Sequence, residues 1–284
     1  MWYCSAVCDI IILIMIIMEE WRRQEESDMQ KTVDGLNINY IIEGEGEPVV
    51  LLHGWGANIK LFDNLIHLLS TKYKVIAPDL PGFGESDEPK EVWDVDRYAD
   101  FVADFVKDFA EGENVTFLGH SFGGRVIFKL NARKNLPFKI QRLILVDAAG
   151  VKPKKTFKQK VKQAIYKLTK KILTSKLFTR FFPNAMENLR KKNGSADYLA
   201  ASPMMRQILV KVVNEDLTDL FPLVTVPTLL IWGRNDTATP VSDAELMEKK
   251  MKDAGLVVLE NCGHFSFLEQ QYTFNRVISS FMKL

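Results

Sequence analysis

A candidate nucleophile stands in the stretch GHSFGG, residues 119–124, where Ser121 lies among three glycines. Glycine has no Cβ, so a backbone rich in glycine can reverse sharply and let neighbouring elements approach closely. A serine hydroxyl is a weak nucleophile at neutral pH. It needs a histidine that takes its proton and a carboxylate that orients this histidine. An alternative interpretation makes Ser121 the N-cap of the helix that follows, which accounts for the serine but not for its glycines.

Ser121 follows one of several short apolar runs. These runs are PVVLLHG, YKVIAP, NVTFLG, IQRLILVDAA, TLLIWG and GLVVLE, and amphipathic helical patterns follow most of them. Short apolar strands that alternate with helices predict a mostly parallel central sheet with helices on both faces. The predicted fold class is therefore α/β.

In such a sheet, functional sites form in the loops at the carboxyl ends of the strands. These loops contain HGWG at residues 53–56, Ser121, Asp147, Asp236 and His264. A serine, two aspartates and a histidine are therefore expected to meet at one edge of the sheet. The four histidines and three cysteines show no metal-ligand spacing, and we expect neither a metal nor a cofactor.

The chain resembles the α/β-hydrolase fold family, in its Ser-His-Asp branch of esterases, lipases and C–C bond hydrolases. The resemblance rests on GHSFGG between a strand and a helix, on HGWG after an earlier strand, and on an aspartate and then a histidine further along. It covers residues 36–284 and implies an α/β-hydrolase fold with a helical cap inserted after the sixth core strand. Relatives place such a cap over the active site, so substrate specificity is expected to depend on it.

The resemblance also implies catalytic roles for three side chains. Ser121 would be the nucleophile, His264 the base and Asp236 the acid, since the family carries them in the order Ser, Asp, His along the chain. Asp147 remains an alternative acid, because some relatives carry the acid after the preceding strand. Asp236 could instead cap the next helix.

The oxyanion hole implied by the resemblance consists of backbone N–H groups. They would come from Phe122, just after the nucleophile, and from Trp55 in the HGWG loop. Gly54 belongs to the same loop, and His53 is expected to support this loop rather than to titrate. The helix that begins at Phe122 adds the positive end of its dipole, which favours a developing oxyanion.

Three functions remain open. The first is a serine hydrolase that cleaves a small or lipid-like carboxylic ester through an acyl-enzyme. The alternative is a C–C bond hydrolase acting on ring-cleavage products of aromatic compounds, although His120 and Phe265 stand where such enzymes commonly carry asparagine and tryptophan. The third is a non-catalytic ligand-binding member of the fold, against which the complete Ser, Asp and His set argues. We expect no nucleic-acid partner, and the oligomeric state stays open.

The alternation of strands and helices stops after the run LILVD. Residues 151–220 show only helical patterns, which predict a helical cap between two parts of a hydrolase core, residues 29–150 and 221–284. Apolar residues recur at helical spacing among lysines in the first part of this insertion, at Phe157, Val161, Ile165, Leu168 and Ile172. This segment is predicted to be a basic amphipathic helix. It would face anionic lipid or an acidic substrate, or pack on the core with a solvated lysine face.

The N-terminal residues 1–28 have a different character. Residues 1–18 are apolar apart from Asp9, and a run of acidic and basic residues follows them. They lack the positive start and the cleavage site of a secretory signal, and they are slightly shorter than the ~20 residues that cross a bilayer. Residues 1–28 are interpreted as an extension outside the fold, with a membrane anchor as the alternative.

The cysteines and the charges bear on where the protein works. Three scattered cysteines are typical of a reducing compartment, so the expected location is cytoplasmic. Peripheral association with an anionic membrane, through the basic cap or through residues 1–18, is the alternative.

Overall fold

The computed structural model describes residues 29–153 and 195–284, together with residues 165, 169, 173 and 189. In this part of the chain, eight strands form one sheet in the order β1-β2-β4-β3-β5-β6-β7-β8. The strands are β1 (Met29–Val33), β2 (Leu36–Glu43), β3 (Pro48–Leu52), β4 (Lys74–Pro78), β5 (Asn114–His120), β6 (Lys139–Val146), β7 (Thr228–Gly233) and β8 (Ala254–Leu259). Strands β3 to β8 pair in parallel, whereas β2 is antiparallel to both β1 and β4. The predicted fold class, α/β with a mostly parallel sheet, is confirmed.

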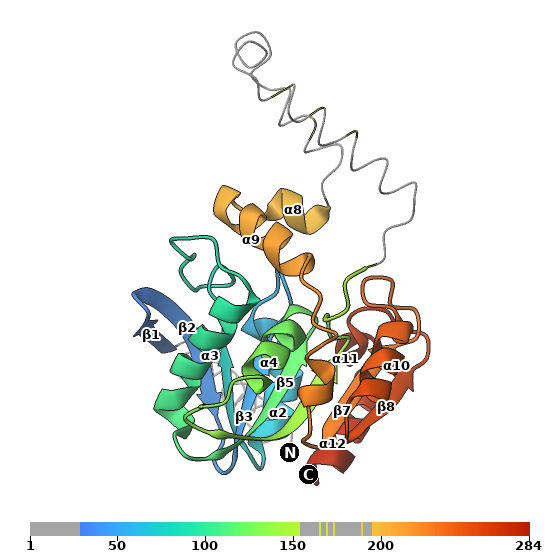
Figure 1. The fold of residues 1–284 in the computed structure, drawn as a ribbon. Helices are drawn as coiled ribbons and strands as arrows, with labels where there is room; N and C mark the ends of the chain where they lie inside the picture. Colours follow the sequence, from blue (N-terminus) through green and yellow to red (C-terminus); the bar gives the residue numbers. More distant parts are fainter. Residues whose placement is uncertain (1–28, 154–164, 166–168, 170–172, 174–188, 190–194) are drawn as a thin grey trace, which may run out of the picture.

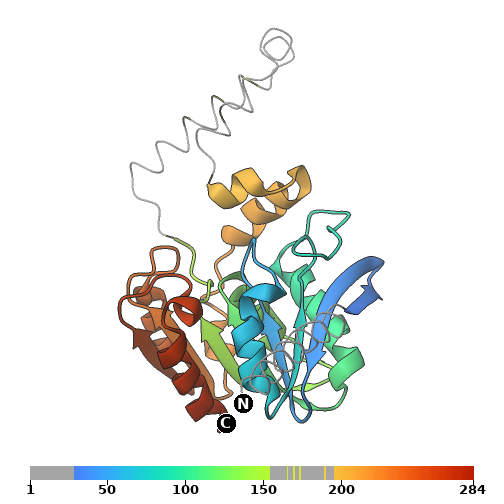
Figure 2. The same cartoon turned by 180° about the vertical axis from the view of Figure 1, so that it is seen from behind.

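Helices cover both faces of the sheet. Figure 1 shows α3 (Val95–Ala110), α4 (Phe122–Asn131) and α10 (Val241–Lys250) in front of the strands. Figure 2, seen from behind, shows α2 (Asp63–Ser70) and α12 (Gln271–Met282) on the other face. The remaining described helices are η1 (Ile59–Phe62), α8 (Ala196–Ala200), α9 (Pro203–Val213), η2 (Phe221–Leu223) and α11 (Ser266–Glu269).

Strand β3 is apolar throughout because both of its faces are buried. Successive side chains of a strand point to opposite faces of the sheet. Val50 and Leu52 of β3 belong to the core that contains residues of α3, α4 and α10, whereas Val49 and Leu51 belong to the core under α2 and α12. All four side chains are fully buried. The sheet is therefore held from both sides, and the loops at its carboxyl end start from fixed points.

The hairpin of β1 and β2 is an element that the apolar runs did not predict. Val33 pairs with Leu36 across a two-residue turn, in which Asp34 and Gly35 both have positive φ angles. An Asp-Gly pair at such a turn is a strong hairpin signal, because both positions need positive φ. The apolar pattern did not predict β2 because asparagines interrupt it at the start of this strand.

The described part of the segment between β6 and β7 contains α8, α9 and η2. Figure 1 shows α8 and α9 beyond the end of the sheet opposite to the C-terminus. Four apolar side chains bury one face of α9, namely Met205, Ile208, Leu209 and Val212. Lys211 Nζ lies 3.0 Å from an Asp94 carboxylate oxygen at the start of α3, and the Ser202 hydroxyl donates to Glu88 at 2.8 Å. These contacts fix α9 to the core.

Two sequence predictions concern segments that lie largely or wholly outside the described residues. They are the basic amphipathic helix over residues 157–172 and the N-terminal extension or anchor at residues 1–28. None of the helices described here combines the length and the apolar character that crossing a membrane requires.

Candidate active site

Ser121 lies at a strained turn between β5 and α4. Its backbone has φ 49° and ψ −107°, a conformation that residues other than glycine rarely adopt. The turn packs so tightly that a Cβ on Gly123 would lie 2.1 Å from the carbonyl oxygen of Leu52. Ser121 occupies the N-cap position of α4, but its side chain makes no capping hydrogen bond, so helix capping does not account for the serine hydroxyl.

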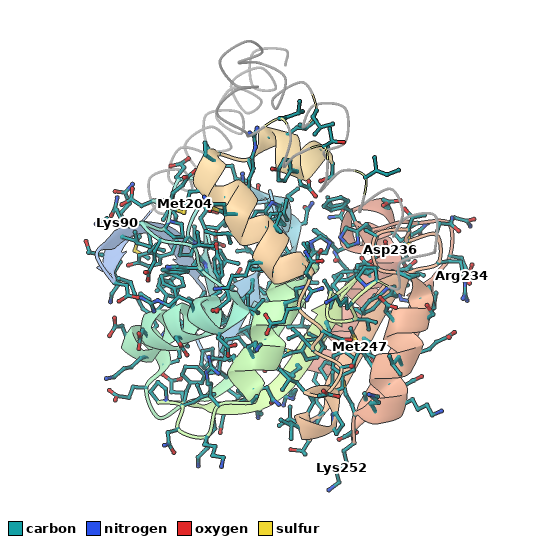
Figure 3. All side chains as sticks on the ribbon, turned by 45° about the horizontal axis from the view of Figure 1, so that its top comes forward. Lys90, Met204, Arg234, Asp236, Met247 and Lys252 are labelled. Carbon is teal, nitrogen blue, oxygen red and sulfur yellow. The ribbon has the colours of Figure 1, made fainter. Side chains whose placement is uncertain are left out.

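A chain of hydrogen bonds joins the serine, the histidine and one aspartate. His264 Nε2 lies 2.9 Å from Ser121 Oγ, and His264 Nδ1 lies 2.8 Å from Asp236 Oδ2. Asp236 is buried in the loop between β7 and α10, at the end of the molecule that faces the reader in Figure 3. The structure therefore brings together the three side chains to which the sequence assigned catalytic roles.

Hydrogen bonds keep the Asp236 carboxylate ionised and oriented. Oδ1 accepts from the backbone N–H groups of Ala238 and Thr239 at 2.8 and 3.0 Å, and Oδ2 accepts from the Thr239 hydroxyl at 2.6 Å. Burial alone would raise the pKa of Asp236, but the hydrogen bonds from His264 and Thr239 outweigh burial and lower it. Asp236 thus orients His264 instead of capping α10, whose N-cap is Pro240.

The Asp236 carboxylate in turn raises the pKa of His264 above its ordinary value. Burial would lower its pKa, but the hydrogen bond and the negative charge of Asp236 outweigh burial and raise it. With Asp236 ionised, Nδ1 carries the proton that is donated to the carboxylate. Nε2 of the neutral ring is then free to accept the proton of Ser121.

The HGWG loop lies directly against the nucleophile turn. A Cβ on Gly54 would lie 2.7 Å from Nδ1 of His120 and 3.2 Å from Cβ of Ser121, so only glycine permits this approach. The Trp55 ring packs edge-on against Phe83 and Phe122, with ring centres 4.8 and 5.5 Å apart. Within the described part of the chain, the backbone N–H groups of Trp55 and Phe122 donate no hydrogen bond, so both could serve an oxyanion.

His53 supports the HGWG loop through hydrogen bonds of its ring. It is buried, and its Nε2 accepts a hydrogen bond from Leu80 N–H at 2.9 Å, so Nδ1 must carry the proton that Gly54 O accepts at 2.8 Å. Burial lowers the pKa of His53, which keeps the ring neutral. The side chain thus links the HGWG loop to the loop after β4.

Asp147, the alternative acid, is placed differently. It is fully buried after β6 and forms no hydrogen bond with His264 in the described structure. Its carboxylate accepts from Gly233 and Ser266 instead. The geometry therefore separates the two aspartates that the sequence left as candidates.

Two residues that hold His264 in place received no such role from the sequence. Nε2–H of His120 donates to the carbonyl oxygen of His264 at 2.8 Å, and burial, followed by the charge of His264, lowers the pKa of His120 to about 3. The Glu269 carboxylate accepts from the N–H groups of Gly263 and Phe265, at 2.9 and 3.3 Å. His120 is signalled by its place beside the nucleophile, whereas nothing local in the sequence marks Glu269.

In the part of the chain that is described, no cluster of three histidines, cysteines or acids is arranged to hold a metal.

Comparison with known proteins agrees with the fold. The family described as alpha/beta hydrolase fold matches residues 47–271. The AB hydrolase superfamily protein YisY of Bacillus subtilis is 29% identical, with 84% of this chain and 92% of YisY covered. A 2-hydroxy-6-oxo-2,4-heptadienoate hydrolase of Pseudomonas putida is 26% identical, with 87% and 93% covered.

Two solved structures show the same architecture. An esterase from Exiguobacterium antarcticum has a TM-score of 0.68 and 28% identity, with 91% of this chain and 99% of the esterase covered. A bacterial membrane phospholipase A has a TM-score of 0.70 and 25% identity, with 99% and 94% covered. Both known hydrolases and known esterases are therefore similar to this chain.

Proposed function

Because the chain belongs to the α/β-hydrolase family, we propose that it is a serine hydrolase that cleaves a carboxylic ester through an acyl-enzyme intermediate. The observation that carries the proposal is the hydrogen-bonded chain from Ser121 through His264 to Asp236, at the strained turn after β5. A structural role alone does not require a serine in that backbone conformation with a histidine on its hydroxyl.

The reaction follows from the geometry of the three side chains. Ser121 Oγ attacks the ester carbonyl carbon while its proton passes to His264 Nε2, and Asp236 stabilises the imidazolium that forms. The N–H groups of Trp55 and Phe122 bind the oxyanion of the tetrahedral intermediate. His264 then gives its proton to the departing alcohol. Water attacks the acyl-enzyme in the second half, with His264 again as base, and releases the acid and Ser121.

One charge close to the site, that of Asp197, disfavours a negatively charged substrate. Asp197 in α8 lies near the HGWG loop, since a Cβ on Gly56 would be 4.0 Å from Asp197 Oδ1. Its charge also contributes to the raised pKa of His264. A carboxylate at this position repels an anionic substrate. A neutral or zwitterionic ester, including a lipid-like one, is therefore preferred, and the likeness to an esterase and to a phospholipase A supports it.

C–C bond hydrolysis is the second candidate. The relative from Pseudomonas putida, named as a hydrolase of a heptadienoate, supports it at 26% identity. His120 and Phe265 depart from the pattern of such enzymes. Asp197 also places a negative charge near the HGWG loop and His264, which disfavours a carboxylate-bearing substrate, so ester cleavage remains the preferred function.

Labelling and turnover by the purified protein test the proposal. We expect hydrolysis of p-nitrophenyl butyrate and decanoate, and covalent labelling at Ser121 by a fluorophosphonate. The Ser121→Ala variant should lose both properties. Ser70→Ala is the matched control, because in the described part of the chain this α2 hydroxyl bonds only to the backbone of its own helix. Undiminished turnover by Ser121→Ala would refute the proposed nucleophile.

A further inference from the structure

Asp147 connects two loops that carry the proposed catalytic residues. It follows β6 directly, has a φ of 45° and is fully buried. Its Oδ1 accepts from the N–H of Gly233, at the end of the strand that leads to Asp236, at 2.8 Å. Its Oδ2 accepts from the N–H and the hydroxyl of Ser266, two residues after His264, at 3.1 and 2.6 Å.

The backbone of Asp147 continues the same connection. Its N–H donates to Ile231 of β7 at 2.9 Å. Its carbonyl oxygen lies 3.0 Å from the hydroxyl of Thr239, which also lies 2.6 Å from Asp236 Oδ2. Within the described structure, the residue therefore forms hydrogen bonds with both loops but with neither Ser121 nor His264.

We propose that Asp147 is a positioning residue of the active site, whose buried carboxylate clamps the Asp236 loop to the His264 loop. This inference rests on the proposed function. Burying a carboxylate is costly unless hydrogen bonds replace its water, and here three donors from two loops do so. Burial raises the pKa of Asp147 to about 7, although the hydrogen bonds from Ser266 and Gly233 act to lower it. The carboxylate has therefore lost contact with water in exchange for bonds to the two loops.

Asparagine cannot reproduce the hydrogen bonds that the Asp147 carboxylate accepts. Asparagine has one acceptor oxygen, and its NH₂ group would face the N–H of Gly233 or the donors of Ser266. The two loops would then separate or rotate, and the distance between His264 and Asp236 would change. A displacement of about 1 Å at a catalytic group can cost a factor of about 10² in rate.

Steady-state kinetics of Asp147→Asn test the clamp. With p-nitrophenyl butyrate we expect kcat to fall about 10- to 100-fold while KM changes less than about 3-fold, because alignment and not substrate binding is lost. The acid limb of the pH profile of kcat/KM should move to lower pH, because His264 loses part of its contact with Asp236 and the nearby charge of Asp147. Ser266→Ala, which removes one of the three donors, should show a smaller loss in the same direction.

Asp243→Asn is the matched control. Asp243 is a partly buried carboxyl whose pKa is raised to about 6 by burial and then by the charge of Asp236, yet its side chain bonds to neither loop in the described structure. Its kcat should stay within about 2-fold of wild type. Equal losses in Asp147→Asn and Asp243→Asn would overturn the clamp, since they would point to charge alone.

Two further outcomes are decisive. Wild-type kcat and an unchanged pH profile in both Asp147→Asn and Ser266→Ala overturn the inference, even if both variants melt at lower temperature. Absence of ester hydrolysis and of Ser121 labelling in the wild type refutes the proposed function instead. In that case the pKa of His264, measured by NMR titration in the wild type and in Ser266→Ala, still tests the clamp, and an unchanged value rejects it.

Discussion

At the scale of single residues, the proposed chemistry depends on two opposed pKa shifts. Hydrogen bonds outweigh burial at Asp236 and lower its pKa, and the carboxylate outweighs burial at His264 and raises that pKa. Asp236 is thus ionised and His264 retains a proton to higher pH than an isolated histidine. Since the base must be neutral to accept the Ser121 proton, activity should rise with pH through the raised pKa of His264.

Replacement of Asp236 by asparagine tests this pair. Asp236→Asn should fold but lose up to about 10⁴ in kcat, because the imidazole loses its orienting and charge-stabilising partner. The acid limb of kcat/KM against pH should also shift to lower pH. Asp147→Asn should lose less, as a positioning residue. A larger loss in Asp147→Asn than in Asp236→Asn would assign the catalytic acid to Asp147.

At the scale of elements, the nucleophile turn depends on how closely α4 and β3 approach. The positive φ of Ser121 is maintained because the glycines around it allow backbone contacts that any Cβ would prevent. A Cβ on Gly123 would clash with the backbone oxygen of Leu52, which cannot move away as a flexible side chain can. The geometry of the turn is therefore a property of the packed strand and helix.

Gly123→Ala should destabilise the fold and remove activity. The new Cβ would lie 2.1 Å from Leu52 O, so β3 and α4 must separate. The free energy of unfolding should fall by about 1–3 kcal/mol, the usual cost of overpacking. Gly255→Ala in β8 is the matched control, since nothing lies within 4 Å of its Cβ position. Chemical denaturation and ester turnover measure both effects, and equal stability of the two variants would contradict this account.

At the scale of the whole molecule, the charge is distributed unevenly. Of 37 basic residues 16 lie in residues 151–212, where only two of the 36 acidic residues occur. The described part of this segment, with α8 and α9, lies at the end of the molecule that carries Asp236 (Figures 1 and 3). A protein with this asymmetry should meet an anionic surface with its basic segment first.

Vesicle binding tests this orientation. A protein that begins at Met29 should sediment weakly with anionic vesicles at low salt and much less at 0.15 M salt, where the Debye length is ~8 Å. Neutral vesicles should bind it less. Replacement of Lys158, Lys162 and Lys167 by glutamate should abolish the binding. Equal binding to neutral and anionic vesicles, or none at low salt, would leave the lysines as an ordinary solvated surface.

The sequence by itself determined the fold class and the three candidate side chains. Apolar runs and helical patterns are short-range consequences of burial, so they indicate strands, helices and their alternation without any knowledge of the contacts between them. GHSFGG identified Ser121 because a sharp turn needs glycine locally. The Asp34-Gly35 turn carried a local signal of the same kind, although the asparagines of β2 obscured the strand.

Only the tertiary structure decided which residue at the edge of the sheet contacts His264 and which residues position the loops. Asp147 and Asp236 follow neighbouring parallel strands, β6 and β7, and nothing in their local sequence tells which one reaches His264. The structure puts Asp236 on His264 Nδ1 and Asp147 between the two loops. His120 likewise holds His264 through its backbone carbonyl oxygen, and Glu269 holds it through the N–H groups of the two neighbouring residues, Gly263 and Phe265. Such contacts depend on where whole loops meet in space, which no local pattern of residues encodes.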